Sequence, residues 1–427
     1  MKGNGFFTEL LEREVVPAMG CTEPAASALA GAKARELLSG GVSKVFISAS
    51  RDMVKNAMGV GIPGCSLKGI EAAVALGVAG GDTSKKLSIL SSVTPEMAAC
   101  ASRLDTVLEL ARDVPSLYVE VTLESDTGHR VSVAISDEHD SFSRIVVDGT
   151  VKVDTSAACH TKKTETPLEG VDIADILNYA ETVDTSTLGF LQTAADANMA
   201  IAEYSIEHRF GLQVGRVMAE GLAFPPDCLD NAFRLGAAYA AAGSDARMSG
   251  CPMPVYINSG SGNQGITVTV PVRILGNYLG AGQERILRAM CVSELVGLML
   301  TEKKSRLSAL CGAFTASIGT ACAYAYLLDG KKETIDRVVN TMVANLTGII
   351  CDGAKNTCAL KIYSCLEAAS MAVKLAVSGR SPDEQCGIVG NNSQSSITNL
   401  SMISKEGMEE TDQTIYSIMT DKGKTRC

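Results

Sequence analysis

The sequence contains no tryptophan, and aromatic residues make up only 4% of its 427 residues. A core dominated by large rings is therefore not expected. Glycine, with 40 residues, and abundant alanine instead predict closely packed helices and glycine-rich loops. Small side chains allow backbones to approach each other or a ligand.

A surplus of basic residues is also missing. The chain has 38 Lys and Arg against 48 Asp and Glu, a formal net charge of −10, so nucleic acid is not expected as a partner. Hydrophobic residues at 46% and charged residues at 20% exclude the composition of a disordered chain. The length predicts two or three structural units.

The start of the chain lacks a basic segment followed by an apolar one, because Glu9, Glu12 and Glu14 interrupt the first turns. We therefore expect a cytoplasmic protein. The longest uncharged stretch, between Arg306 and Asp329, is rich in Ala, Gly, Ser and Thr. That composition favours a buried helix or helix pair over a membrane span, so no membrane partner is expected.

Hydrophobic periodicity predicts an α+β fold, with a mainly helical domain and a smaller α/β domain containing a mostly antiparallel sheet. Residues 1–40 are expected to form N-terminal helices, broken before Pro24, that pack on the C-terminal domain. The α/β domain is expected over 41–160 and the helical domain over 161–427. Runs typical of strands cover 44–48, 117–123, 130–135 and 144–153, and Ile266 to Ile274 forms one β-like interruption in the helical part.

Several common catalytic motifs are absent, namely Walker A, HExxH and GxSxG. Gly59 to Gly64 matches GxGxxG, but Pro63 lies inside it and the preceding run typical of a strand ends too early. The segment is therefore expected to be a loop whose glycines let its backbone lie close to a neighbouring segment, and not a dinucleotide site. With only 4 histidines and no Ser/His/Asp pattern around them, histidine-based catalysis is poorly supported.

The cysteines carry more information. Fourteen are present, and in a reducing compartment they are expected to be core residues, metal ligands or reactive thiols and not disulfides. Cys351 and Cys358 bracket CDGAKNTC, where Asp352 and Gly353 predict a break before a helix that runs to about Val377. We expect Cys351 at the helix entrance and Cys358 one to two turns inside, where the helix dipole favours thiolates.

A third ligand would have to come from elsewhere, and Cys311 lies 40 residues before Cys351. The absence of a CxxC pair disfavours zinc-ribbon sites and leaves an iron–sulfur centre permitted. Buried structural cysteines are the alternative. Cys365, seven residues after Cys358, is a nearby cysteine outside the proposed ligand set and is an example of that alternative.

Two further segments combine small and polar residues. Gly20 to Pro24 places Cys21 on a short turn beside Thr22 and Glu23, where its thiol could act as a base or nucleophile if a cation or metal lowered its pKa. A helix-capping turn with an incidental cysteine is the alternative. Asn258 to Gly265 could offer backbone N–H groups to a carboxylate, or could be a plain flexible turn.

These motifs together resemble the L-cysteine desulfidase family, relatives of the iron–sulfur L-serine dehydratase alpha chain. The resemblance covers essentially the whole chain and rests on GCTEPAA (20–26), KNAMGVGIPG (55–64), GSGNQGI (260–266), ALCG (309–312) and ICDGAKNTCALK (350–361). It implies a lyase that converts L-cysteine to pyruvate, ammonia and hydrogen sulfide without pyridoxal phosphate. It also implies a 4Fe-4S cluster held by Cys311, Cys351 and Cys358, with Cys21 as the catalytic proton acceptor.

The resemblance makes the helical domain the cluster-binding, catalytic domain and a small amino acid the expected substrate. Elimination of water from L-serine at the same site is one alternative, because only the β leaving group differs. A non-catalytic iron–sulfur sensor is the other. The sequence leaves open whether the chain forms a homo-oligomer. It also leaves open whether Cys427 is an ordinary terminal thiol or a removable plug on an open iron position.

Overall fold

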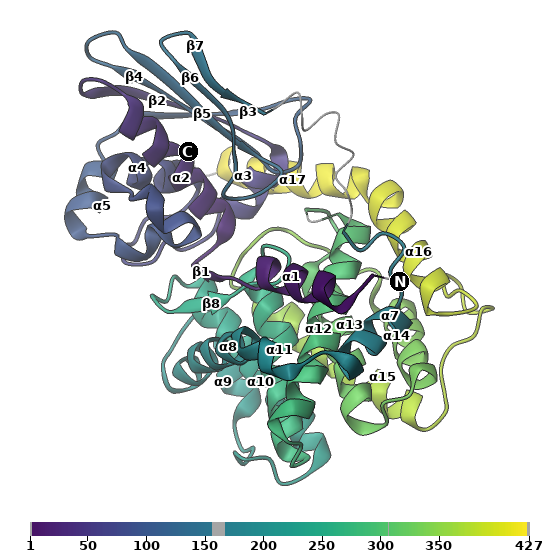
Figure 1. Ribbon diagram of the computed structural model, residues 1–427. Coiled ribbons are helices and arrows are strands. Elements are labelled where there is room, and N and C mark those ends of the chain that lie inside the picture. Colours follow the sequence, from purple (N-terminus) through teal and green to yellow (C-terminus); the bar gives the residue numbers. More distant parts are fainter. Residues whose placement is uncertain (1, 156–166, 306, 425–427) are drawn as a thin grey trace.

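The computed structural model describes residues 2–155, 167–305 and 307–424 and has two parts, a sheet covered by helices and a larger all-helical assembly (Figure 1). The expected boundary at 160 lies outside the described residues, so the domain division at that point stays a proposal. The α+β class is confirmed.

The sheet has six strands in the order β3-β2-β4-β5-β6-β7. All neighbouring strands pair antiparallel except β2 and β3, which are parallel. This confirms the expected mostly antiparallel sheet. The strands are β2 (Val42–Ala49), β3 (Thr106–Leu110), β4 (Tyr118–Ser125), β5 (Arg130–Ser136), β6 (Phe142–Val147) and β7 (Thr150–Asp154), accompanied by α2 (Thr22–Leu37), α3 (Arg51–Ala57), α4 (Ile70–Gly80), η1 (Thr83–Ser92) and α5 (Pro95–Ala101).

The helical part is built around central helices that are buried on nearly all sides. Its elements are α1 (Asn4–Glu14), α7 (Ile173–Thr182), η2 (Thr185–Leu188), α8 (Gly189–Glu207), α9 (Val214–Ala219), α10 (Leu229–Met248), α11 (Gly262–Tyr278), α12 (Gln283–Lys304), α13 (Gly312–Leu328), α14 (Lys332–Leu346), α15 (Cys358–Val377), α16 (Ser393–Met402), η3 (Ile403–Gly407) and α17 (Glu409–Lys424). A two-stranded antiparallel ribbon, β1 (Pro17–Met19) with β8 (Pro254–Tyr256), joins the start of the chain to this part.

The first two helices belong to different cores. Side chains of α1, including Phe7 and Leu11, lie in the large apolar cluster of the helical part. Side chains of α2, including Leu29, lie in the cluster beneath the sheet. The expectation that both helices pack on the C-terminal domain is therefore wrong for α2, whose alanine-rich surface packs on α4 and the sheet. The turn between them sits where the two parts meet.

The expected β-like segment at 266–274 is wrong, because these residues lie inside α11. Val268, Val270 and Val272 alternate with other residue types as in a strand. Other helices surround this helix, so both the valines and most of the residues between them are buried. The hydroxyls of Thr267 and Thr269 donate to backbone carbonyls four residues earlier, which satisfies them inside the core. Tertiary burial thus overrides the local pattern.

Glycine allows the close helix packing that the composition predicts. A Cβ at Gly77 of α4 would overlap the carbonyl oxygen of Ala28 in α2, and one at Gly319 of α13 would overlap that of Ser293 in α12. The uncharged stretch after 306 forms α13, which is buried along nearly its whole length. Among the described helices, none is both long and apolar enough to cross a membrane.

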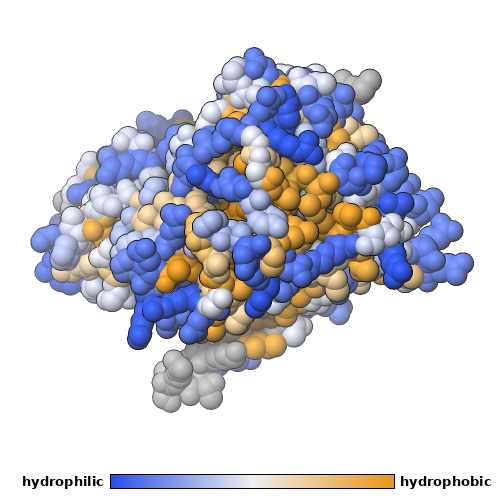
Figure 2. All heavy atoms as spheres, turned by 90° about the horizontal axis from the view of Figure 1, so that it is seen from below, coloured by the Kyte–Doolittle hydropathy of each residue, from blue (hydrophilic) through white to orange (hydrophobic). Residues whose placement is uncertain are grey.

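Seen from below, apolar residues gather over a broad area of the surface (Figure 2).

Candidate functional site

Four cysteines from widely separated parts of the chain line one cavity of about 100 Å³. They are Cys21, Cys311, Cys351 and Cys358. Cys21 and Cys311 are buried, while Cys351 and Cys358 are partly accessible. The structure therefore brings together all four cysteines that the sequence singled out.

The turn that carries Cys21 is fixed from two sides. Cys21 directly precedes α2 in extended conformation. The next residue, Thr22, donates its hydroxyl to the carbonyl oxygen of Gly260 at 2.8 Å. Glu23 accepts a hydrogen bond from the side-chain amide of Asn56 at 3.0 Å. Because β1 pairs with β8, the segment before this turn lies beside the strand that precedes the glycine-rich loop at 258–265.

A short antiparallel contact places Cys311 beside Cys351. The backbone N–H of Cys311 donates to Ile349 at 2.9 Å, and that of Cys351 donates to Ala309 at 2.6 Å. Leu310 and Ile350 form the bridge between them. Cys311 ends this segment directly before α13, so its thiol lies at the start of that helix.

The segment CDGAKNTC is a loop and not the first turns of a helix. Helix α15 begins at Cys358 itself, so the expectation that Cys358 lies one to two turns inside is wrong. Gly353, at φ +88°, allows the loop to pass against the backbone of Lys55, where any Cβ would clash. The Cys358 sulfur accepts a hydrogen bond from the backbone N–H of Lys355 at 3.4 Å.

Positive side chains surround the cysteines on the described part of the chain. Lys55 and Lys304 are buried, and both interact electrostatically with Cys351. Lys361 interacts with Cys311 and Cys351. Lys355 interacts with Cys351 and Cys358. Such charges stabilise thiolates, which are the form of cysteine that binds metals.

The Cys311 and Cys351 thiols share a hydrogen bond. It lowers the pKa of Cys351 to about 5, a shift that Lys55 and Lys304 support against the effect of burial. The same hydrogen bond, together with burial, raises the pKa of Cys311. The shared hydrogen bond therefore favours ionisation of Cys351 over ionisation of Cys311.

Cys21 differs from these two. Burial raises its pKa to about 12, opposed chiefly by the guanidinium of Arg247. Arg247 is buried on α10 and donates its Nε–H to the carbonyl oxygen of Gly20 at 3.0 Å. A Cβ at residue 262 would lie 2.9 Å from the guanidinium carbon of Arg247, so Gly262 makes room for this side chain.

Two amide oxygens at the cavity have no hydrogen-bond partner among the described residues. These are Oδ1 of Asn56 and Oδ1 of Asn263, both buried. Each residue lines the cavity. Buried polar atoms are almost always paired, so unpaired ones at a cavity indicate groups that a ligand can satisfy. Amide oxygens accept hydrogen bonds from an ammonium group.

The donor set fits a multinuclear cluster better than a single ion. Within the described ranges, no three His, Cys, Asp or Glu side chains converge closely enough to hold one metal ion. A cluster has a different requirement, because each cysteine binds its own iron atom. Three thiols spread around one cavity, with lysines beside them, match that requirement and supply charge to balance the thiolates.

Sequence reasoning missed Arg247 and Lys304. Both lie at the ends of long helices without a motif around them, and their role becomes visible only when α10 and α12 are placed against the cysteines. Cys365 lines no part of the cavity and is buried in the helical core. Cys427 lies outside the described residues.

The fold and the cavity define a class: an α+β protein with a mainly helical part and a buried pocket lined by thiols and cations. The family model described as serine dehydratase alpha chain matches residues 84–417. The chain belongs to this family. Its relatives include UPF0597 proteins of Oleidesulfovibrio alaskensis, 36% identical over 97% of this chain and 98% of the relative, and of Clostridium perfringens, 37% identical over 98% of both chains. A UPF0597 protein of Aeromonas salmonicida is 36% identical over 97% of this chain and 96% of the relative.

Proposed function

We propose that the protein is an iron–sulfur-dependent lyase that converts L-cysteine to pyruvate, ammonia and hydrogen sulfide. The observation that carries the proposal is the convergence of Cys21, Cys311, Cys351 and Cys358 on one cavity that also contains Arg247. Membership of the serine dehydratase alpha chain family supports a β-elimination at this cavity. The proposal requires no pyridoxal phosphate.

In this proposal Cys311, Cys351 and Cys358 hold a 4Fe-4S cluster. With three protein ligands, the bound cluster would supply a Lewis acid at its fourth iron for the leaving group or carboxylate. Lys55 and Lys304 favour the ionised form of Cys351, and Lys361 adds positive charge beside Cys311 and Cys351.

The chain's own polar groups orient the substrate. Arg247 provides a planar guanidinium for the substrate carboxylate, the geometry that carboxylates bind best. The unpaired oxygens of Asn56 and Asn263 accept from the substrate ammonium group. A cavity near 100 Å³ excludes a drug-sized ligand.

Cys21 accepts the α-proton in this scheme. Arg247 beside it favours the thiolate against the effect of burial. As the α-proton leaves, the electron pair of the C–H bond forms the α–β double bond and the β-sulfur departs as hydrosulfide. The resulting aminoacrylate takes up a proton at its β-carbon, and water then hydrolyses the imine to pyruvate and ammonia.

L-Serine is the second candidate substrate, and the family description favours it. Loss of hydroxide in place of hydrosulfide leaves every other step unchanged. A thiolate is the softer ligand and prefers iron, which favours L-cysteine.

The test is anaerobic reconstitution with iron and sulfide, followed by parallel assays of pyruvate from L-cysteine and L-serine, with the D-isomers as controls. Faster turnover of L-cysteine, with equal amounts of sulfide and pyruvate, supports the proposal. Faster turnover of L-serine makes the protein an L-serine dehydratase. No turnover of either amino acid by protein with an intact cluster would indicate an iron–sulfur sensor.

Location and assembly belong to the same proposal. A cytoplasmic location keeps the pocket thiols reduced.

Apolar side chains on α9 and α15, including Val217, Leu360 and Met371, are about half exposed and fit contacts with a second copy of the chain. Light scattering coupled to size-exclusion chromatography measures whether the chain is a homo-oligomer.

A further inference from the structure

Gln264 lines the cysteine cavity but takes no part in the proposed elimination. It lies in the first turn of α11, and only 4% of its surface is exposed. The hydroxyl of Thr301 on α12 donates to its side-chain oxygen Oε1 at 2.9 Å. One end of the amide is therefore held, and the other end is an N–H₂ group that can donate to a ligand.

This N–H₂ group lies over the beginning of α13. A Cβ at residue 312 would lie 2.9 Å from Nε2 of Gln264, so Gly312 leaves room for the amide. Gly312 and Ala313, the first two residues of α13, also line the cavity. The first N–H groups of a helix have no partner within that helix. Donors from the first turns of α11 and α13 therefore lie together on one side of the cavity.

We propose that Gln264 binds the carboxylate of the amino-acid substrate, an inference that rests on the proposed lyase function. Both helices are 17 residues long, and the N-terminus of a helix carries partial positive charge that favours anions. A carboxylate gains from that charge, whereas an ammonium group is repelled by it. Arg247 lies against the same turn of α11, at Gly262, so Arg247 and Gln264 each donate to the carboxylate.

The ammonium group has an acceptor of its own in this turn. Asn263 directly precedes Gln264, and its Oδ1 is buried without a hydrogen-bond partner in the described part of the chain. The Nδ2 group of Asn263 donates to the sulfur of Met248 at 3.6 Å, which leaves Oδ1 for the substrate. Two adjacent residues thus distinguish the two charges of an amino acid, because Asn263 presents an acceptor and Gln264 a donor.

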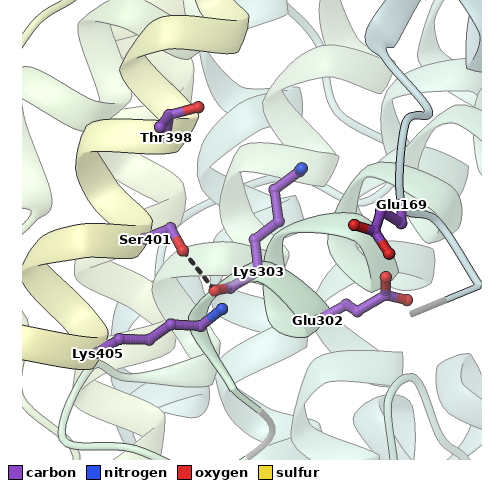
Figure 3. Close-up of a pocket in the computed structure, with 6 residues that line it drawn as sticks. All are labelled: Glu169, Glu302, Lys303, Thr398, Ser401 and Lys405. Atoms are coloured by element: carbon purple, nitrogen blue, oxygen red, sulfur yellow. Dashed lines mark hydrogen bonds between the residues drawn. The ribbon is translucent and has the colours of Figure 1, made fainter. Parts of the chain in front are cut away.

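Thr301 is a positioning residue in this proposal, because it acts on the substrate only through Gln264. It is buried in the last turn of α12. This end of α12 is held by α16 beside a second cavity of about 240 Å³. Figure 3 shows the bond that holds it, in which the hydroxyl of Ser401 donates to the carbonyl oxygen of Lys303 at 2.6 Å. The turn that carries Thr301 is therefore fixed.

The binding test uses anaerobically prepared, full-length, cluster-loaded protein and isothermal titration with L-alanine, which has no β leaving group to eliminate. Gln264→Glu and Asn263→Asp each add one negative charge to the same turn, one residue apart. Gln283→Glu adds the same charge at an exposed position that lines no part of the cavity. Iron content is measured on every variant, so that loss of the cluster is not mistaken for loss of binding.

We expect Gln264→Glu to weaken the binding of L-alanine about tenfold or more, because a carboxylate in place of the N–H₂ group repels the ligand carboxylate. Asn263→Asp should bind at least as tightly as the wild type, and Gln283→Glu should bind like the wild type. Tighter binding by Gln264→Glu would place the ammonium group there and overturn the proposal. Equal weakening by Gln264→Glu and Asn263→Asp would also overturn it, since the effect would not depend on which residue carries the charge.

Neutral variants decide the matter if Gln264→Glu does not retain its iron. Gln264→Met removes the donors at similar size and should also weaken binding about tenfold. Thr301→Val should weaken binding, whereas Thr301→Ser, which keeps the hydroxyl, should retain it. Wild-type affinity in Gln264→Met would overturn the contact and leave the proposed lyase intact.

Failure of the proposed function gives a different result. A wild type that neither binds L-alanine nor turns over L-cysteine or L-serine would contradict the lyase itself and the contact with it. In an active enzyme we expect Gln264→Met to raise KM with little change in kcat, as for an interaction made equally in the ground state and the transition state. An unchanged KM would contradict only the contact.

Discussion

Cys21 and the three other pocket cysteines differ in what surrounds their sulfur atoms. Cys351 lies among lysines, whereas Cys21 has Arg247 as the principal cation that opposes its burial. The lysines favour the ionised form of Cys351, which suits a metal ligand, whereas burial makes the thiolate of Cys21 a stronger base. This difference supports Cys351 as a cluster ligand and Cys21 as the proposed base.

Replacing Cys21 with Ala should lower the elimination rate about 10²- to 10⁴-fold, the usual contribution of a general base, while bound iron stays at the wild-type level. Pyruvate formation and iron content are measured on the same sample. Cys251→Ala is the matched control, because Cys251 is also buried but lines no part of the cavity. Loss of iron in Cys21→Ala would make Cys21 a ligand instead of a base.

Arg247→Lys should raise the KM for the amino acid about tenfold or more, because lysine keeps the charge but loses the planar pair of donors for a carboxylate. Steady-state kinetics on L-cysteine and L-serine measure the change. Arg234→Lys on the same helix is the control, since Arg234 does not line the cavity. An unchanged KM in Arg247→Lys would remove Arg247 from carboxylate binding.

Glu294 makes stability depend on pH. It is fully buried on α12, and burial raises its pKa from 4.5 to about 8. Between these values the folded protein holds a proton on Glu294 that the unfolded chain has released, so the contribution of Glu294 to the free energy of unfolding should fall by about 1.4 kcal/mol per pH unit as pH rises. Glu294→Gln should flatten this slope. Denaturant unfolding of the wild type and of Glu294→Gln at pH 5, 6.5 and 8 measures the two slopes of the free energy of unfolding against pH. Equal slopes would contradict the prediction.

At the residue scale, the sequence identified the four cysteines and the segments that carry Lys55, Asn56 and Asn263, but not Arg247 or Lys304. CTEP and CDGAKNTC are local motifs and can be recognised directly. The adjacency of Cys311 and Cys351 depends on pairing between 309–311 and 349–351, which no periodicity signals. Arg247 and Lys304 reach the cavity through helix packing, which a single sequence does not encode in any short pattern.

At the scale of elements, α17 connects the end of the described chain to the cysteine pocket. It runs between the sheet part and the helical part (Figure 1). Its Asp412 forms ion pairs with Lys55 and with Arg51, the latter at 3.0 Å. Lys55 also pairs with Asp52 at 3.3 Å. This network holds buried Lys55 beside Cys351.

Asp412→Ala should lower the free energy of unfolding by several kcal/mol, on the order of 3, because it leaves a buried lysine with one partner fewer. Gln413→Ala, an exposed change on the same helix, should have little effect. Chemical denaturation monitored by circular dichroism measures both. Equal stability of the two variants would show that the ion pairs do not anchor α17.

Element prediction succeeded for the strands with one buried face and failed for β3 and α11. Alternating apolar residues located β4 and β5 because their inner faces pack on the helices beneath the sheet. The edge strand β3 was missed, since it is short and its side chains are mostly exposed. Helix α11 was read as β-like because burial on all sides removes the helical contrast between faces, leaving only the valine alternation.

At the scale of the whole molecule, residues from both parts line the cysteine pocket, including Asn56 of α3 and Arg247 of α10. Cys21 comes with the turn between α1 and α2, which belong to different cores. The ligand candidates come from the helical part. Movement of one part against the other would therefore change the distance between the proposed base and the proposed cluster. The length predicted two or three structural units, but not that the site would take residues from both parts.

The central claim is that Cys311, Cys351 and Cys358 hold one 4Fe-4S cluster. The most direct measurement is iron and acid-labile sulfide per chain after anaerobic reconstitution of the wild type, of the three single Ala variants, and of Cys365→Ala. We predict about four iron atoms per chain in the wild type and in Cys365→Ala, and a sharp loss in each of the other three. Wild-type iron content in those three variants, or equal loss in Cys365→Ala, would contradict the account.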